Sequence, residues 1–145
     1  MKSFVVFVLK VSFFFVLTII LLKYCGGEKI NVSFKAAAGL IEITPSENIA
    51  MGGYFGREGL SDDVHDEIYA RCLIVESSDG KRIAFVSLDI IGFLRYDVLE
   101  IKQKLNSNIE LCIFSTHQHS GPDTIGIWGV SPSSGRNENY ITEIR

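Results

Sequence analysis

The chain has 145 residues, of which 47% are hydrophobic, and a formal net charge of −3 at pH 7. This length fits one domain. Without the first 27 residues, which hold three of the lysines, 11 basic and 17 acidic residues remain, a net charge of −6. An acidic domain without a basic stripe is poorly suited to a phosphate backbone, so we expect no nucleic-acid partner.

The amino end is almost wholly apolar over residues 4–22, interrupted by Lys10, and Lys2 and Lys10 make it positively charged. A helix rising ~1.5 Å per residue would bring this run close to the ~30 Å core of a bilayer. The charge-free part, residues 11–22, is nearer the length of a signal-peptide core, and small residues precede a possible cut after Gly27. We therefore expect residues 1–27 to be an apolar helix that serves as a cleaved signal peptide or a membrane anchor, with a lipid-modified Cys25 as a third reading. The protein is expected to be exported: secreted or periplasmic if the segment is cleaved, membrane-anchored if it is not.

Three strands and a long loop are predicted next. Residues 38–44 form the first strand, which Pro45 ends. Residues 46–64 contain a glycine-rich stretch and are predicted to be a loop, and long loops in compact domains are usually functional or disordered. Strands at residues 68–75 and 83–88 follow, joined by Asp79-Gly80, a pair typical of hairpin turns.

A helix is predicted over residues 94–105, followed by a strand at residues 109–114. Four apolar residues at spacings of four, three and four fall on one face of this helix: Leu94, Val98, Ile101 and Leu105. Strand, helix and strand with short links make a βαβ unit, so strands 83–88 and 109–114 should run parallel. The expected fold class is α/β: a mixed sheet with a β-hairpin and a βαβ unit, helices packed on the sheet, and the N-terminal apolar helix ahead of it.

His117 and His119 follow the last predicted strand. Two histidines separated by one residue can turn to the same side of an extended segment and hold one metal ion, commonly zinc. The alternative is a pair of solvated loop histidines. Ligands of such sheets bind beyond the carboxyl ends of the strands, which places Asp89 at the same edge. Asp89 is expected either to accept the second ring N–H of a metal-bound histidine or to cap the helix that begins near Phe93.

Five pieces of the sequence carry a family resemblance through their order and spacing. They are Ala38-Gly39 with Ile43-Thr44-Pro45, Met51-Gly52-Gly53-Tyr54, His65-Asp66 with Tyr69-Ala70-Arg71, Val86-Ser87-Leu88-Asp89, and Thr116-His117-Gln118-His119-Ser120-Gly121-Pro122. Over residues 38–129 the chain resembles the N-terminal part of the neutral/alkaline, non-lysosomal ceramidases. The resemblance implies a zinc-dependent amidase that cleaves the N-acyl bond of ceramide into sphingosine and fatty acid.

The resemblance also implies roles for single residues. His117 corresponds to a zinc ligand, and His119 to a catalytic residue that lies against metal and substrate. Gln118 stands where the family more often has threonine. Four residues are expected around the metal or on the substrate side: Asp89, His65, Ser120 and Gly121. For His65 the alternative is a third metal ligand.

The family's remaining ligands, another histidine, a glutamate and a tyrosine, are expected beyond Arg145. Residues 28–145 would then be the N-terminal portion of a longer catalytic domain that needs its C-terminal part for activity. The expected partners are a ceramide-like lipid and a membrane surface. Two other functions stay open: an exported zinc hydrolase of the same fold acting on another amide or ester, and a truncated, membrane-tethered domain without turnover.

Overall fold

The computed structural model describes residues 33–57, 59–105, 108–129 and 133–145. These residues belong to one compact unit, Ser33–Arg145. The predicted apolar helix and the signal or anchor at residues 1–27 lie outside the described residues. Within the described ranges, no helix is long and apolar enough to cross a membrane.

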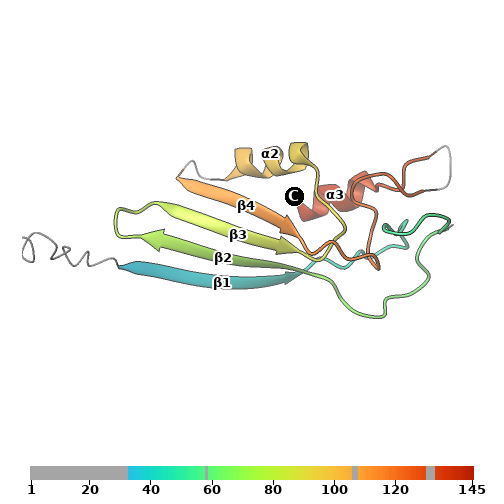
Figure 1. Ribbon diagram of the computed structural model, residues 1–145, viewed down its shortest axis with the longest axis horizontal. Helices are drawn as coiled ribbons and strands as arrows, with labels where there is room; N and C mark the ends of the chain where they lie inside the picture. The colour runs from blue at the N-terminus through green and yellow to red at the C-terminus, as the bar shows by residue number, and fades with distance from the viewer. Residues whose placement is uncertain (1–32, 58, 106–107, 130–132) are drawn as a thin grey trace, which may run out of the picture. The chain divides into compact units, whose positions relative to one another are not determined.

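Four strands form one mixed sheet in the order β1-β2-β3-β4 (Figure 1). The strands are β1 (Phe34–Glu42), β2 (Tyr69–Ser77), β3 (Arg82–Leu88) and β4 (Ile109–Ser115). β2 pairs antiparallel with both β1 and β3, whereas β3 and β4 run parallel. The predicted hairpin, the parallel pair and the mixed sheet are therefore confirmed, although β1 begins at Phe34 rather than at Ala38.

The structure of the hairpin turn between β2 and β3 explains why the sequence predicts it. Gly80 has a φ of 80°, a conformation that favours glycine. Its N–H donates to the Ser77 carbonyl at 2.9 Å, and Ser77 N–H donates to the Lys81 carbonyl at the same distance. Asp79 pairs with Lys81 at 2.8 Å, so the polar groups of the turn satisfy one another at the surface.

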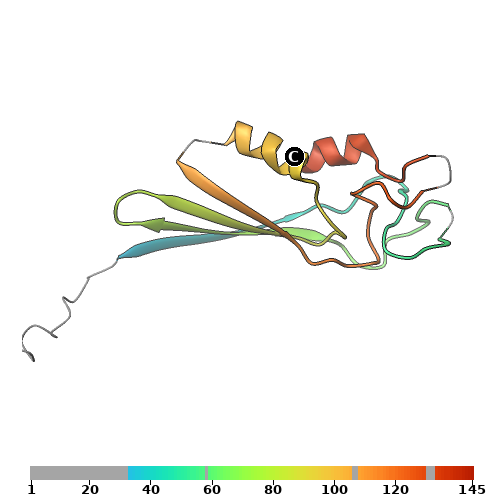
Figure 2. The same cartoon turned by 45° about the horizontal axis from the view of Figure 1, so that its top comes forward.

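Two helices lie on the same side of the sheet (Figure 2). They are α2 (Arg95–Lys104) and α3 (Glu138–Ile144). The predicted apolar face of α2 is only half-buried, and the fully buried residue of that helix is Asp97. The sequence did not predict α3, which Asn137 caps by accepting hydrogen bonds from the backbone of Asn139 and Tyr140.

The apolar core lies on the side of the sheet that carries the helices. One cluster holds Ile43, Ile68, Leu88 and Ile90, with Phe93, Ile113 and Ile144 packed against it. The Tyr140 hydroxyl donates to the Ile43 carbonyl at 2.7 Å, which ties α3 to the end of β1, and burial raises the pKa of this phenol. The opposite face of the sheet exposes large apolar side chains: Phe34, Leu40, Leu73, Phe85 and Phe114.

Candidate metal site at the edge of the sheet

The histidine loop begins where the parallel strands end. The segments that follow β3 and β4 stay side by side, because Thr116 N–H donates to the Leu88 carbonyl at 2.9 Å and His117 N–H donates to the Ile90 carbonyl at 3.1 Å. His117 therefore lies at the carboxyl end of β4, beside the segment that follows β3, as the sequence predicts. Backbone hydrogen bonds fix its position.

His117 combines an unusual backbone with a held ring. Its φ of 59° makes it the one non-glycine residue in the described part of the chain with a positive φ. That conformation costs an ordinary residue about 1–2 kcal/mol, and strain of this kind concentrates at functional sites. The ring Nδ1 lies 2.7 Å from the Ile91 carbonyl oxygen. Because a carbonyl oxygen only accepts, Nδ1 carries a proton, so in the neutral tautomer Nε2 has the lone pair that can bind a metal ion.

The two imidazole rings are close enough to share one ion. Their centres lie 5.1 Å apart and their planes meet at 71°. Two imidazoles bound to one tetrahedral zinc, with Zn–N bonds of ~2.0–2.1 Å, would place their ring centres roughly 5 Å apart. The pair thus fits zinc, although within the described residues no group of three His, Cys, Asp or Glu side chains could hold a metal. The described residues supply part of a ligand set.

The glycine-rich loop packs directly against His119. Gly52 N–H donates to the Gly121 carbonyl at 2.9 Å, which brings this loop alongside the histidine loop. At Gly53, whose φ is 108°, an added Cβ would lie 2.5 Å from the Cβ of His119. The Tyr54 ring meets the His119 ring edge-on at 5.2 Å. Gly53 and Tyr54 therefore form the close packing against the second histidine.

Arg57 also packs against His119 and Tyr54. The sequence did not predict this role. Its Nη1 donates to the His119 carbonyl at 3.2 Å, and its guanidinium lies 5.2 Å from the centre of the Tyr54 ring. The contact joins residues 62 positions apart in the chain. A single arginine inside a predicted loop gives no signal of such a contact.

Asp89 lies at the predicted edge but its carboxylate turns elsewhere. It accepts hydrogen bonds from the Tyr69 backbone N–H and from the Arg71 guanidinium. The Ile91 carbonyl, rather than Asp89, takes the His117 ring N–H. The helix-cap alternative is wrong, because α2 begins after Leu94 and has no side-chain cap. Asp89 reaches the histidine loop through its backbone carbonyl, which accepts from Gln118 Nε2 at 2.6 Å.

The remaining predicted residues gather in a cavity of about 590 Å³ on another side of the loop. Its lining includes His65, Asp89, Gln118, Ser120 and Gly121, but neither His117 nor His119. The His65 side chain is 97% exposed and pairs with its neighbour Asp66 at 2.7 Å. The structure thus separates the histidine pair from the other predicted site residues, and His65 does not join that pair in a metal-binding group within the described residues.

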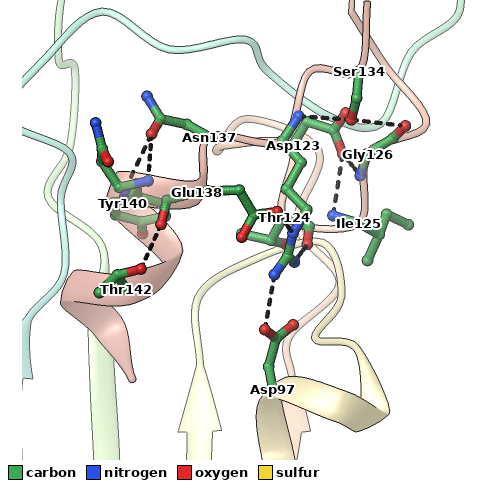
Figure 3. Close-up of polar contacts among 12 residues, drawn as sticks. Asp97, Asp123, Thr124, Ile125, Gly126, Ser134, Asn137, Glu138, Tyr140 and Thr142 are labelled. Carbon is green, nitrogen blue, oxygen red and sulfur yellow. Dashed lines mark hydrogen bonds and ion pairs between the residues drawn. The ribbon is translucent and has the colours of Figure 1, made fainter.

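A buried polar network holds the segment that follows the histidine loop (Figure 3). The Asp123 carboxylate accepts hydrogen bonds from the backbone N–H groups of Ile125, Gly126 and Trp128. The side chain of Arg136, only 5% exposed, donates to the carbonyl of Thr124 and pairs with Asp97 of α2 at 2.7 Å.

Arg136 also pairs with Glu138 at the start of α3. Burial lowers the pKa of Arg136, but the hydrogen bonds to Asp97 and Glu138 outweigh it and raise the pKa above its usual value. The guanidinium thereby links both helices to the loop that carries the histidines. The sequence reading missed Arg136 and Asp97, although a charged residue on an apolar helical face was a visible signal.

Comparisons with known proteins place the chain beside one group of enzymes. It is 29% identical to neutral ceramidase 1 of Arabidopsis thaliana over 119 residues, which are 77% of this chain and 15% of that protein. It is 31% identical to the neutral ceramidase of Drosophila melanogaster over 106 residues, again 15% of that protein. It is 36% identical to neutral ceramidase 3 of Arabidopsis thaliana over 92 residues, 58% of this chain and 13% of the relative.

The fold is also similar to that of a solved structure. The crystal structure of the neutral ceramidase from Pseudomonas aeruginosa matches with a TM-score of 0.55 at 24% identity, over 63% of this chain and 16% of that one. No family profile matches the chain. The chain spans about 15% of the length of these curated relatives. The resemblance to the neutral ceramidases that the sequence motifs predict is therefore confirmed, over a segment that is a small part of each relative.

Proposed function

We propose that this chain carries the histidine loop of a zinc-dependent amide hydrolase that cleaves the N-acyl bond of ceramide-like lipids. The observation that carries the proposal is the histidine pair, with ring centres 5.1 Å apart and His117 Nδ1 held by the Ile91 carbonyl. Supporting it, the relatives that align with this chain are named neutral ceramidases. A solvated pair of loop histidines would not need a strained backbone or packed glycines.

In the proposed reaction the oxygen of a water molecule bonds to the amide carbonyl carbon and the C–N bond breaks. Both protons of the water go to the nitrogen, so the amine leaves as an ammonium ion and the acyl part leaves as a carboxylate. Zinc, when bound, would polarise the carbonyl and lower the pKa of a bound water to about 7. His117 would hold the metal through Nε2. His119 would be a second ligand; alternatively, as the resemblance implies, it would lie unligated beside the metal and hold or pass a proton at the reacting amide.

The described residues supply two candidate ligands, whereas a catalytic zinc usually has about three protein ligands and a water. We propose that the others come from outside the described residues, as the resemblance implies for the region beyond Arg145. Activity would then need that further part, while metal binding by the histidine pair would be weak but measurable in this chain. Export through residues 1–27, and action on lipid at a membrane surface, are parts of the same proposal.

Hydrolysis of a fluorescent ceramide by a chain extended with the missing ligands tests this function. The proposal expects activity that a chelator removes and added zinc restores, and that His117→Ala abolishes. Full activity in the presence of the chelator, or in His117→Ala, would refute the metal mechanism. Zinc-dependent cleavage of short N-acyl amides with no cleavage of ceramide would keep the mechanism and assign a different substrate.

A further inference from the structure

Arg57 differs from the other described arginines in its surroundings. Arg71, Arg82, Arg136 and Arg145 each pair with a carboxylate. Arg95 has no such partner within the described residues, but it is exposed to solvent. Arg57 is half-buried, and its polar contact in the described part of the chain is a neutral one, the His119 carbonyl.

A half-buried cation that has no counterion among the described residues is suited to bind an anion. Taking a charge out of water is unfavourable unless the charge is paired, and a guanidinium has five N–H donors, of which the His119 carbonyl uses one. Its planar fork matches the two oxygens of a carboxylate. Stacking on the Tyr54 ring, 5.2 Å away, holds the guanidinium in one place.

The position of Arg57 indicates which anion it would meet. Its guanidinium touches the backbone of His119, whose ring lies beside that of His117. The adjacent surface is apolar: the Phe55 side chain is 90% exposed and its ring lies 6.3 Å from that of Trp128. An anion bound to Arg57 would thus lie close to His119 and near these aromatic side chains.

We propose that Arg57 binds the carboxylate of a fatty acid, the acyl product of the proposed reaction, with the alkyl chain over Phe55 and Trp128. This inference rests on the proposed function for its ligand. Hydrolysis turns a neutral amide into a carboxylate and an amine, so a negative charge appears on the acyl side of the cleaved bond. Among the described residues, Arg57 is the cationic side chain that contacts the histidine pair, through the His119 carbonyl. It would pair with the carboxylate charge as that charge forms.

Binding of octanoate to the 145-residue chain, measured calorimetrically with and without zinc, tests the proposal. We expect Arg57→Gln to weaken octanoate binding by roughly tenfold or more, as for other hydrogen bonds to charged groups. Arg57→Lys, which keeps the charge but loses the fork, should weaken it less. Arg95→Gln is the matched control and should leave the affinity unchanged. Acetate and octanol test the carboxylate and the alkyl chain of octanoate separately. Arg57→Gln should weaken the binding of acetate and leave the binding of octanol unchanged.

Equal octanoate affinity in the parent chain and Arg57→Gln would overturn the proposal. If Arg57→Gln does not fold, unchanged affinity in Arg57→Lys, in both low and high salt, would overturn it instead. A loss of zinc affinity with unchanged octanoate affinity would show that Arg57 only holds His119, which also overturns it. The proposed function fails separately: in that case the parent chain binds no zinc, while the zinc-free octanoate series still decides the role of Arg57.

Discussion

His65 and the pair His117–His119 both lie in loops that follow or precede strands of one sheet, yet their surroundings differ. His65 is 97% exposed and its contact is the adjacent Asp66. His117 has one ring nitrogen held by a carbonyl from 26 positions earlier, and His119 is packed against the glycine-rich loop. Contacts from distant parts of the chain, rather than the residue type, distinguish the proposed metal ligand from a surface histidine.

The largest expected effect comes from the polar network behind the histidine loop. Arg136→Met leaves Asp97 buried without its closest cation, and removing one partner of a buried ion pair costs about 3–5 kcal/mol. Urea denaturation measures the loss. Lys102→Met, which breaks an exposed pair with Glu110, is the control and should cost no more than about 1 kcal/mol. Equal losses in the two variants would mean that the network does not stabilise the loop.

Gly53→Ala tests the packing against His119. The new Cβ would lie 2.5 Å from the His119 Cβ, so the histidine must move. Overpacking of this kind typically costs about 1–3 kcal/mol, in addition to the strain of an alanine at positive φ. Gly56 also has a positive φ, but a Cβ added there meets nothing within 4 Å. Gly56→Ala therefore measures the cost of the backbone strain alone. Zinc affinity should fall in Gly53→Ala alone, and a similar fall in Gly56→Ala would contradict the proposed packing role.

Substitutions at His117 itself measure the backbone strain. Alanine and glycine both remove the imidazole and its hydrogen bond, but only glycine adopts a φ of 59° freely. We expect His117→Gly to be more stable to unfolding than His117→Ala by about 1 kcal/mol. Equal stabilities would show that the backbone relaxes once the ring is gone, so that the ring imposes the strain.

The smallest effect is expected at His65. Its side chain is almost fully exposed and pairs with an exposed carboxylate, so His65→Ala should change the free energy of unfolding by less than about 0.5 kcal/mol. Zinc affinity should also stay the same. A clear loss of zinc would revive His65 as a third ligand and remove the contrast between the two loops.

The sheet could be predicted because its signals are local. The Asp79-Gly80 pair predicted the hairpin, and the strand, helix and strand pattern predicted the parallel pair. The histidine pair was also local, since two residues at one strand end are enough to define it. The helix α3 was not predicted, because its seven residues carry little periodicity.

The contacts that prepare the site could not be predicted from residue patterns. The acceptor for the His117 ring is a backbone carbonyl. Every residue has such a carbonyl, so the sequence does not show which one will accept the hydrogen bond. Asp89 was the expected acceptor because a carboxylate at the right strand end is visible in sequence, but Arg71 from the neighbouring strand takes it. Arg57 reaches His119 only once the two loops are side by side.

The central claim is that His117 and His119 bind one metal ion while His65 does not. Zinc binding to the chain, titrated calorimetrically, tests it most directly. The account predicts one zinc ion per parent chain, the same in His65→Ala, and loss of binding in both His117→Ala and His119→Ala. Unchanged zinc binding in His117→Ala, with loss in His65→Ala, would contradict it.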